Sequence, residues 1–256
     1  MILFLIIIVI ILISILIRLI FNNKIDKIYI INLKRRNDRL LFIKNNYNLN
    51  KPFSLIEAVD GKNLNINELK KNKIIDNETL RQLEQKQRTS HYELTNKGSL
   101  GCYLSHYNIW KAFFENKDKI ILIFEDDTIF NKITLREINK RLTLLPEDWD
   151  IYLLSNPEFC YHKIKLDRNL YKIKRFFLTN AYIINKRGVK KILESGTIFP
   201  INQQIDSYLS ELALDFNLNI YNHSNYKYYE QSGNFGTDIQ IKSINELNYD
   251  RKLFSF

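Results

Sequence analysis

The sequence is poor in the residues that build disulfide-linked or zinc-bound frameworks. Its 256 residues include two cysteines, Cys102 and Cys160, and four histidines. Two cysteines are too few for a disulfide framework or a Cys-rich zinc site, and no histidine has zinc-ligand spacing. A chain of this length is long enough for one sizeable apolar core, so we expect the core to hold the fold together.

Positive charge is abundant but is not concentrated anywhere. The chain carries 38 Lys and Arg against 28 Asp and Glu, a formal charge of +10. Such an excess suits anionic partners such as nucleotide phosphates, nucleic acid or anionic lipid. The focused basic stripe that is typical of nucleic-acid binding is missing, so we predict no nucleic-acid partner.

The longest apolar run lies at the N-terminus. Residues 2–21 are apolar except for Ser14 and Arg18, and about 20 apolar residues span a bilayer. No Lys or Arg precedes the run and no small-residue cleavage site follows it, which argues against a cleavable signal peptide. The sequence predicts an uncleaved anchor over residues 1–22, followed by one domain over residues 23–256.

The side of the membrane stays open at this point. Positive charges on the C-terminal side, at the end of the apolar run and after it, favour a cytosolic domain by the positive-inside rule. These charges are Arg18, Lys24, Lys27, Lys34, Arg35 and Arg36. Two N-glycosylation sequons begin at Asn77 and Asn222, and they matter only in a lumenal domain. We therefore predict a single-pass membrane protein without assigning the side.

Apolar runs alternate with helical patterns along the rest of the chain. Strands are expected at 27–33, 53–61, 120–130, 149–154, 178–185 and 218–223, and helices at 35–47, 99–115, 186–194 and 203–216. This alternation predicts an α/β fold with a mostly parallel central sheet. Residues 63–95 are polar, and we expect helical pieces there within a flexible insertion or lid.

One expected strand ends in three acids. The run IILIFEDDTIF, residues 120–130, places Glu125, Asp126 and Asp127 directly after five apolar residues. Ligands of α/β sheets bind where strands end, and close carboxylates attract a hard cation such as Mg²⁺ or Mn²⁺. In an extended strand, Glu125 and Asp127 would share one side. The alternative is a solvated acidic turn with lysine partners such as Lys132.

Three stretches together resemble a known family. They are IYIINLKRRNDRL (28–40), GSLGCYLSHYNIW (98–110) and ILIFEDD (121–127). Their order and spacing resemble glycosyltransferase family 25, which includes lipooligosaccharide and collagen-type galactosyltransferases. Weaker matches extend the resemblance over residues 27–240.

The resemblance implies a GT-A-like single domain, a UDP-sugar donor and Mn²⁺, or Mg²⁺, at the acidic turn. The implied reaction moves a hexose, galactose or glucose, to a hydroxyl of a glycan or protein, with inversion. The chain departs from the family pattern at Ser99, where a glutamate is usual, and at Gln204, where the proline of a Pro-Val or Pro-Ile pair is usual. These departures place the acceptor or the level of activity in doubt.

Residue roles follow from the same motifs. Asp127 is the best metal ligand, because Asp-x-Asp spacing maps onto Glu125 and Asp127, and Asp126 completes the predicted metal set. Asp206 is the candidate general base, since direct displacement requires a carboxylate to take the acceptor proton. Six further residues are candidates for binding the donor or substrate: Asn32, Arg39, Asp60, Ser105, His106 and Tyr182. Asp238 is a weaker pocket candidate.

Several of these residues have plainer alternatives. Arg39 suits a phosphate or a uracil carbonyl, but it could belong to a solvated basic face. His106 shares a helix face with Cys102, four residues before it, which is also the pattern of a core histidine. Asp60 could simply form an Asp-Gly turn, and Asp206 could lie on an exposed helix face.

Two other functions use the same features. A metal-dependent phosphoesterase or nuclease could use the acidic turn, but it needs further carboxylates from other strands, and no second cluster is evident. A non-catalytic, membrane-tethered binding module could hold anionic partners on its basic surface. We predict the glycosyltransferase.

Overall fold

The predicted membrane anchor lies almost entirely outside the described part of the chain. The computed structural model describes residues 7–8, 24–85, 90, 92–94, 96–131, 133–155, 157–167, 169–215, 218–223, 229–236 and 238. Within these ranges no helix has both the length and the apolar character needed to cross a bilayer. The anchor over residues 1–22 stays a prediction.

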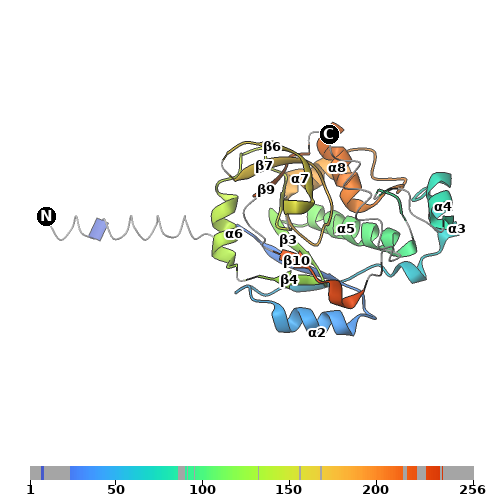
Figure 1. Cartoon of the computed structure of the whole chain (residues 1–256), viewed down its shortest axis with the longest axis horizontal. Helices are drawn as coiled ribbons and strands as arrows, with labels where there is room; N and C mark the ends of the chain where they lie inside the picture. Colours follow the sequence, from blue (N-terminus) through green and yellow to red (C-terminus); the bar gives the residue numbers. More distant parts are fainter. Residues whose placement is uncertain are drawn as a thin grey trace.

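A single eight-stranded sheet forms the centre of the domain (Figure 1). Its order is β2-β1-β3-β8-β5-β9-β7-β6. The strands are β1 (Lys27–Asn32), β2 (Ser54–Glu57), β3 (Ile120–Glu125), β5 (Ile151–Leu153), β6 (Cys160–Lys165), β7 (Leu170–Phe176), β8 (Ala181–Asn185) and β9 (Ile220–His223). Only β8 and β7 run against the other strands of this sheet. The predicted α/β fold with a mostly parallel sheet is therefore confirmed.

Helices cover both faces of the sheet. They are α2 (Asn37–Asn46), α3 (Ile66–Lys71), α4 (Asn77–Glu84), α5 (Lys97–Glu115), α6 (Leu135–Leu142), α7 (Lys186–Leu193) and α8 (Ile205–Asp215). Because strand side chains alternate, Ile121 and Ile123 of β3 pack with α5, α7 and α8, whereas Leu122 and Phe124 pack with α2 and α6. Burial on both faces explains why β3 is a continuous apolar run.

The helical pieces predicted within residues 63–95 are present as α3 and α4, and the described residues of this segment pack against the core. The short helices α3 and α4 turn apolar side chains toward the core beside α5, and Ile75 and Leu94 are buried. The buried Thr79 hydroxyl also donates to the carbonyl of Ile201 at 2.5 Å. A few well-placed apolar residues are therefore enough to fix this polar segment.

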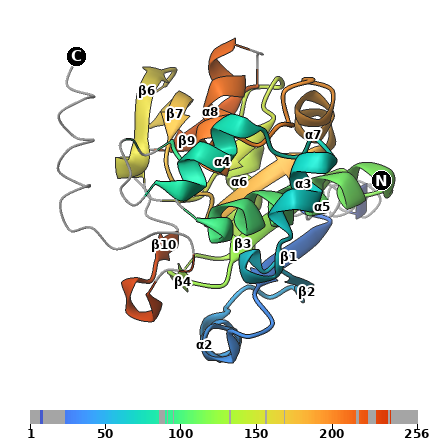
Figure 2. The same cartoon turned by 90° about the vertical axis from the view of Figure 1, so that its right-hand side faces the viewer.

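Two pairings were not expected from the sequence. The antiparallel strands β6 and β7 form one end of the sheet, and Figure 2 shows them far from β2 at the other end. A second sheet pairs β4 (Thr128–Phe130) with β10 (Tyr229–Gln231) in antiparallel register. This small sheet brings the C-terminal part of the chain beside the acidic turn.

The two sequons differ in accessibility. Asn222 is buried, and its side-chain amide donates to the carbonyls of Leu153 and Ser155. Asn77 is exposed at the start of α4. In the folded domain only the Asn77 side chain, of these two, is open to a glycan.

A buried charge cluster connects α7 to the sheet. Asp150 is fully buried and accepts hydrogen bonds from Arg187 Nε at 2.8 Å, Lys191 Nζ at 2.5 Å and the backbone N–H of Asn219 at 2.9 Å. We expect Asp150→Ala to lower the free energy of unfolding by about 2–4 kcal/mol, because the buried N–H of Asn219 and two partly exposed cations lose their acceptor. Urea denaturation measures this change.

The matched control lies on the same helix. Lys190 and Glu194 form an ion pair at 3.9 Å with both side chains exposed. We expect Glu194→Ala to cost less than about 0.5 kcal/mol, since exposed pairs contribute little. Equal losses in the two variants would contradict a special role for Asp150.

Candidate active site

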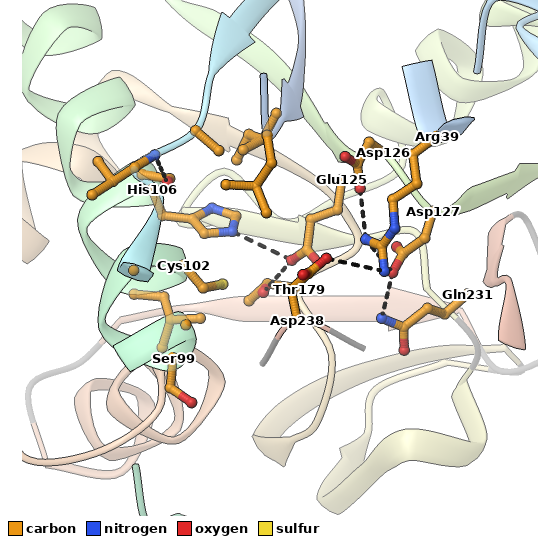
Figure 3. Close-up of a pocket in the computed structure, with 18 of the residues that line it drawn as sticks. Arg39, Ser99, Cys102, His106, Glu125, Asp126, Asp127, Thr179, Gln231 and Asp238 are labelled. Carbon is orange, nitrogen blue, oxygen red and sulfur yellow. Dashed lines mark hydrogen bonds and ion pairs between the residues drawn. The ribbon is translucent and has the colours of Figure 1, made fainter. Parts of the chain in front are cut away.

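A cleft of about 470 Å³ lies at the carboxyl ends of β1, β2 and β3 (Figure 3). Because these strands are parallel neighbours, the loops that follow them meet at one edge of the sheet. The predicted residues that line the cleft are Arg39, Asp60, Ser105, His106, Glu125, Asp126, Asp127 and Asp206. Asn32 and Tyr182 are not among the lining residues, and both support residues that are.

The three acids point in different directions. Strand β3 ends at Glu125, and Asp126 and Asp127 form the turn before β4. Strand alternation therefore does not apply beyond Glu125. Glu125 Oε1 accepts hydrogen bonds from the Thr179 hydroxyl at 2.8 Å and lies 3.3 Å from His106 Nε2. All three residues line the cleft, and Asp126 and Asp127 are buried, so the alternative of a solvated acidic turn does not hold. Lys132, the partner suggested for that alternative, lies outside the described residues.

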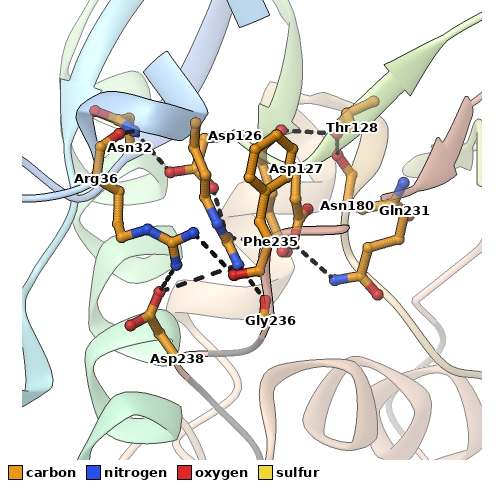
Figure 4. A network of polar contacts seen from close by, with 12 residues as sticks. Asn32, Arg36, Asp126, Asp127, Thr128, Asn180, Gln231, Phe235, Gly236 and Asp238 are labelled. Carbon is orange, nitrogen blue, oxygen red and sulfur yellow. Dashed lines mark hydrogen bonds and ion pairs between the residues drawn. The ribbon is translucent and has the colours of Figure 1, made fainter. Parts of the chain in front are cut away.

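Asp126 is held by protein donors at both oxygens. Asn32 Nδ2 donates to Oδ2 at 2.7 Å, and Arg39 donates to Oδ1 at 2.8 Å (Figure 4). We therefore assign Asp126 the role of orienting Arg39. Asn32 hydrogen-bonds to Asp126 and does not itself line the cleft.

Asp127 has a different environment. Its Oδ2 accepts hydrogen bonds from Arg39 at 3.2 Å and from Gln231 Nε2 at 3.1 Å. Its Oδ1 is buried and has no hydrogen-bond partner among the described residues. Burial, and then the neighbouring charge of Glu125, raise the pKa of Asp127 to about 7. Burial also raises the pKa of Asp126, against the lowering effect of Arg39.

These observations fit a divalent cation. Arg39 supplies one positive charge beside three carboxylates, so the turn keeps an excess of negative charge. Asp127 Oδ1 is a buried oxygen without a partner, and oxygen donors are what Mg²⁺ and Mn²⁺ prefer. Glu125 Oε2, which also accepts no hydrogen bond in the described residues, is the second available oxygen.

The motif that contains Ser105 has a structural explanation. A Cβ at Gly101 would lie 2.4 Å from the carbonyl oxygen of Val59, so only glycine lets α5 approach the loop after β2. One turn later, Ser105 Oγ accepts from the Val59 N–H at 2.8 Å and donates to the Gly101 carbonyl at 2.6 Å. Gly101 and Ser105 thus dock the helix against the loop and give the cleft its floor.

The C-terminal segment, by which we mean the described residues between 231 and 238, closes one side of the cleft. Arg39 donates to the Gly236 carbonyl at 2.8 Å, and Arg35 pairs with Asp238 at 2.8 Å and with Asp60 at 2.7 Å. Burial opposes ionisation of Asp238, but hydrogen bonds from Arg35 and Arg36 outweigh it and hold its pKa below the usual value. Apart from Asp238, this segment was not among the predicted site residues.

Asp206 lies in the first turn of α8 and lines the same cleft. Its Oδ2 accepts from the backbone N–H of Leu178 at 3.1 Å, and its Oδ1 accepts from that of Ser207 at 2.8 Å. The side chain is buried, so the alternative of an exposed helix-face aspartate is excluded. Gln204, at which the chain departs from the family pattern, also lines the cleft.

A possible metal-binding group was missed in the sequence. The donor atoms of Cys102, His106 and Glu125 lie within 4.8 Å of one another. Cys102 and His106 have the i, i+4 spacing that places two side chains on one helix face, and β3 supplies the glutamate. The sequence offered the helix spacing, but the third residue depends on how α5 packs against β3.

Comparison with known proteins identifies the family. Residues 25–209 match the family described as "Glycosyltransferase family 25 (LPS biosynthesis protein)". The chain belongs to glycosyltransferase family 25. The match covers the acidic turn and Asp206, and it ends before the C-terminal segment that closes the cleft.

Relatives in glycosyltransferase family 25 agree with this assignment. Procollagen galactosyltransferase 1-B of Xenopus laevis is 31% identical over 189 residues, which cover 70% of this chain and 30% of that protein. Procollagen galactosyltransferase 2 of Homo sapiens is 30% identical over 192 residues, which cover 70% and 29%. The chain thus spans about 30% of the length of these relatives.

Solved structures show weaker similarity. UDP-glucose pyrophosphorylase complexed with UDP-glucose matches with a TM-score of 0.38 and 11% identity, over 81% of this chain and 92% of that one. A197 from STIV matches with a TM-score of 0.38 and 10% identity, over 85% and 98%. Similarity at this level carries no argument about the reaction.

Proposed function

We propose that this glycosyltransferase moves a hexose, galactose or glucose, from a UDP-sugar to a hydroxyl group of a glycan or protein. One observation carries the proposal. A single cleft contains the acidic turn, whose three carboxylates are paired with one arginine, Arg39, and it also contains Asp206. The procollagen galactosyltransferases among its relatives support galactose as the sugar and a protein hydroxyl as one kind of acceptor.

The acidic turn suits the diphosphate side of the donor. Glu125 and Asp127 would hold Mn²⁺ or Mg²⁺ through their free oxygens. When bound, such an ion neutralises the phosphates of the leaving group by Lewis-acid chemistry. Arg39 is held rigidly by Asp126 and Gly236, so its guanidinium is fixed beside the same turn.

Asp206 suits the acceptor side. In a direct displacement, the acceptor oxygen bonds to the anomeric carbon, the bond from that carbon to the phosphate oxygen breaks, and UDP leaves with the electron pair. The acceptor proton passes to Asp206 as general base. Inversion at the anomeric carbon follows from attack opposite the leaving group, and it rests on the family resemblance and not on a bound substrate.

The phosphoesterase alternative is less well supported. A two-metal site needs a second set of ligands close to the first. Among the described residues, the one close group of three metal-ligating side chains shares Glu125 with the acidic turn and includes a cysteine and a histidine. Hard-metal phosphoesterase chemistry would not favour a cysteine ligand.

The membrane anchor completes the proposal. We place residues 2–21 in a bilayer as a single span, which would keep the cleft near membrane-bound acceptors. The side of the membrane is left open. Treatment with a glycosidase tests the side through Asn77, because a lumenal domain would carry a removable glycan there.

Release of UDP tests the function directly. We expect the full-length protein in detergent to release UDP from UDP-galactose or UDP-glucose in the presence of Mn²⁺ and an acceptor hydroxyl. We also expect EDTA to lower the rate at least tenfold and added Mn²⁺ to restore it, because Glu125 and Asp127 would lose their shared cation. A rate that is unchanged by EDTA would refute the metal, and hydrolysis of simple phosphodiesters would favour the alternative.

A further inference from the structure

Three buried side chains connect the apolar core to Glu125. The indole Nε1 of Trp110 donates to the hydroxyl oxygen of Tyr182 at 3.0 Å. That hydroxyl lies 2.8 Å from Nδ1 of His106, and Nε2 of His106 lies 3.3 Å from Glu125 Oε1. Trp110, Tyr182 and His106 are all 0% exposed, and they contact one another directly.

The positions of the protons follow from counting donors and acceptors. An indole N–H can only donate, so the Tyr182 oxygen accepts from Trp110. The hydroxyl proton of Tyr182 then needs an acceptor of its own. In the described part of the chain, His106 Nδ1 is the remaining hydrogen-bond partner of that hydroxyl. His106 Nδ1 therefore carries the lone pair, and Nε2 carries the proton that points at Glu125.

We propose that Trp110, Tyr182 and His106 form a positioning relay that fixes the carboxylate of Glu125 for catalysis. Glu125 Oε1 is held from two directions, by His106 Nε2–H and by the Thr179 hydroxyl (Figure 3). The carboxylate cannot rotate freely, and Oε2 is presented to the cleft. The role of Glu125 itself rests on the proposed function, whereas the proton positions do not.

The same reasoning separates the relay from a metal site at Cys102, His106 and Glu125. A metal ion on His106 would take the Nε2 lone pair and move the ring proton to Nδ1. The Tyr182 oxygen would then accept from both Trp110 and His106, and its own proton would be unpaired. The close approach of Cys102 is therefore packing on the helix face, and we infer that this group binds no metal.

The first test reads the tautomer of His106 without reference to activity. In the full-length protein with ¹⁵N-labelled histidine, the shifts of the two ring nitrogens distinguish the tautomers, and His106→Gln assigns the signals. We expect the proton on Nε2 and the lone pair on Nδ1. We also expect no change in these signals when Zn²⁺ alone is added. An Nδ1–H tautomer, an imidazolium, or a Zn²⁺-dependent shift would overturn the relay.

The second test uses Tyr182→Phe with a matched control. Tyr103 lies on α5, the helix that carries His106 and Trp110, is as buried as Tyr182, and donates one hydrogen bond to the Ile198 carbonyl at 3.0 Å. We expect Tyr182→Phe to let both His106 tautomers form and to lower kcat about 10–100-fold with little change in the donor KM. Tyr103→Phe should change neither the tautomer nor kcat.

A third variant keeps the test decisive if Tyr182→Phe does not fold. Trp110→Phe removes the donor that forces Tyr182 to give its proton to His106, together with part of a buried ring. We expect a mixture of tautomers and a smaller loss of kcat. Wild-type kcat with an unchanged tautomer in both variants would refute the relay. Absence of transfer in the wild-type protein would count against the proposed function, and the tautomer measurement would still decide the relay.

Discussion

Replacing Asp127 by asparagine is expected to lower kcat about a thousandfold. The buried Oδ1 of Asp127 has no partner among the described residues, and it is the oxygen best placed to hold a cation at the acidic turn. A bound ion contributes several kcal/mol to transition-state stabilisation, and about 4 kcal/mol corresponds to a thousandfold in rate. The measurement is kcat for UDP release from UDP-hexose with saturating Mn²⁺.

The same variant should be more stable than the wild-type protein without metal. The pKa of Asp127 is about 7 in the folded protein against an ordinary value of 3.8, so its ionised form is unfavourable in the fold. The wild-type protein therefore loses stability as the pH rises from about 4 to above 7. We expect the stability gain of Asp127→Asn, measured by urea denaturation in EDTA, to be larger at pH 8 than at pH 5.

Two controls separate metal binding from general damage. Mn²⁺ should raise the Tm of the wild-type protein and leave that of Asp127→Asn unchanged. Asp148→Asn removes a carboxylate that binds Asn219 and Tyr221 and does not line the cleft, so kcat should stay the same. A loss of less than tenfold in Asp127→Asn, or an equal Mn²⁺ response in both proteins, would contradict the assignment.

The centre of the fold could be predicted because its signal is local. An apolar run such as β3 is stable only when both faces are covered, and β1 has the same character. The strand β3 and the acids that follow it were therefore evident from the sequence. Arg39 follows β1 by a few residues, and parallel pairing of β1 with β3 was enough to bring Arg39 to the acidic turn.

The edge of the sheet could not be predicted, because its pattern carries little apolar signal. Strand β6 exposes most of its residues, including Ile164 at 52%. Its alternation of lysine with apolar residues therefore does not correspond to one buried and one exposed face, and it does not identify a strand. Strand β10 is three residues long and depends on Tyr229 packing against Phe130 and Phe124. Such pairing is set by distant residues, and Gln231 reaches Asp127 only through it.

The roles of site residues were hardest to predict for side chains that do not line the cleft themselves but orient a residue that does. Asn32 and Tyr182 were expected to bind the donor, and both instead orient lining residues by hydrogen bonds. A sequence shows that a polar residue follows or interrupts an apolar strand, but the direction of its side chain depends on packing. The turn at Asp126 and Asp127 adds to this, because strand alternation stops at Glu125.

Replacing Asp206 by asparagine is expected to lower kcat about a hundredfold to ten-thousandfold, the range for loss of a general base. Asparagine keeps the size of the side chain and one oxygen that can accept from the N–H of Leu178 or Ser207. The other N–H loses its acceptor, so we expect the fold to be retained with a stability loss of about 1–3 kcal/mol. The donor KM should also change little, because Asp206 is assigned to the acceptor.

The decisive measurement varies the acidity of the acceptor. If Asp206 takes the proton of the attacking hydroxyl, an acceptor with a more acidic hydroxyl needs less help from a base. The ratio of wild-type to Asp206→Asn rates should then fall as the acceptor pKa falls. Ser207→Ala is the matched control, because Ser207 lies beside Asp206 on α8, binds Gln203 and does not line the cleft. The rate ratio could instead be independent of acceptor acidity, with a loss of stability as large as the loss of activity. Asp206 would then only stabilise the start of α8, and the base would lie elsewhere in the cleft.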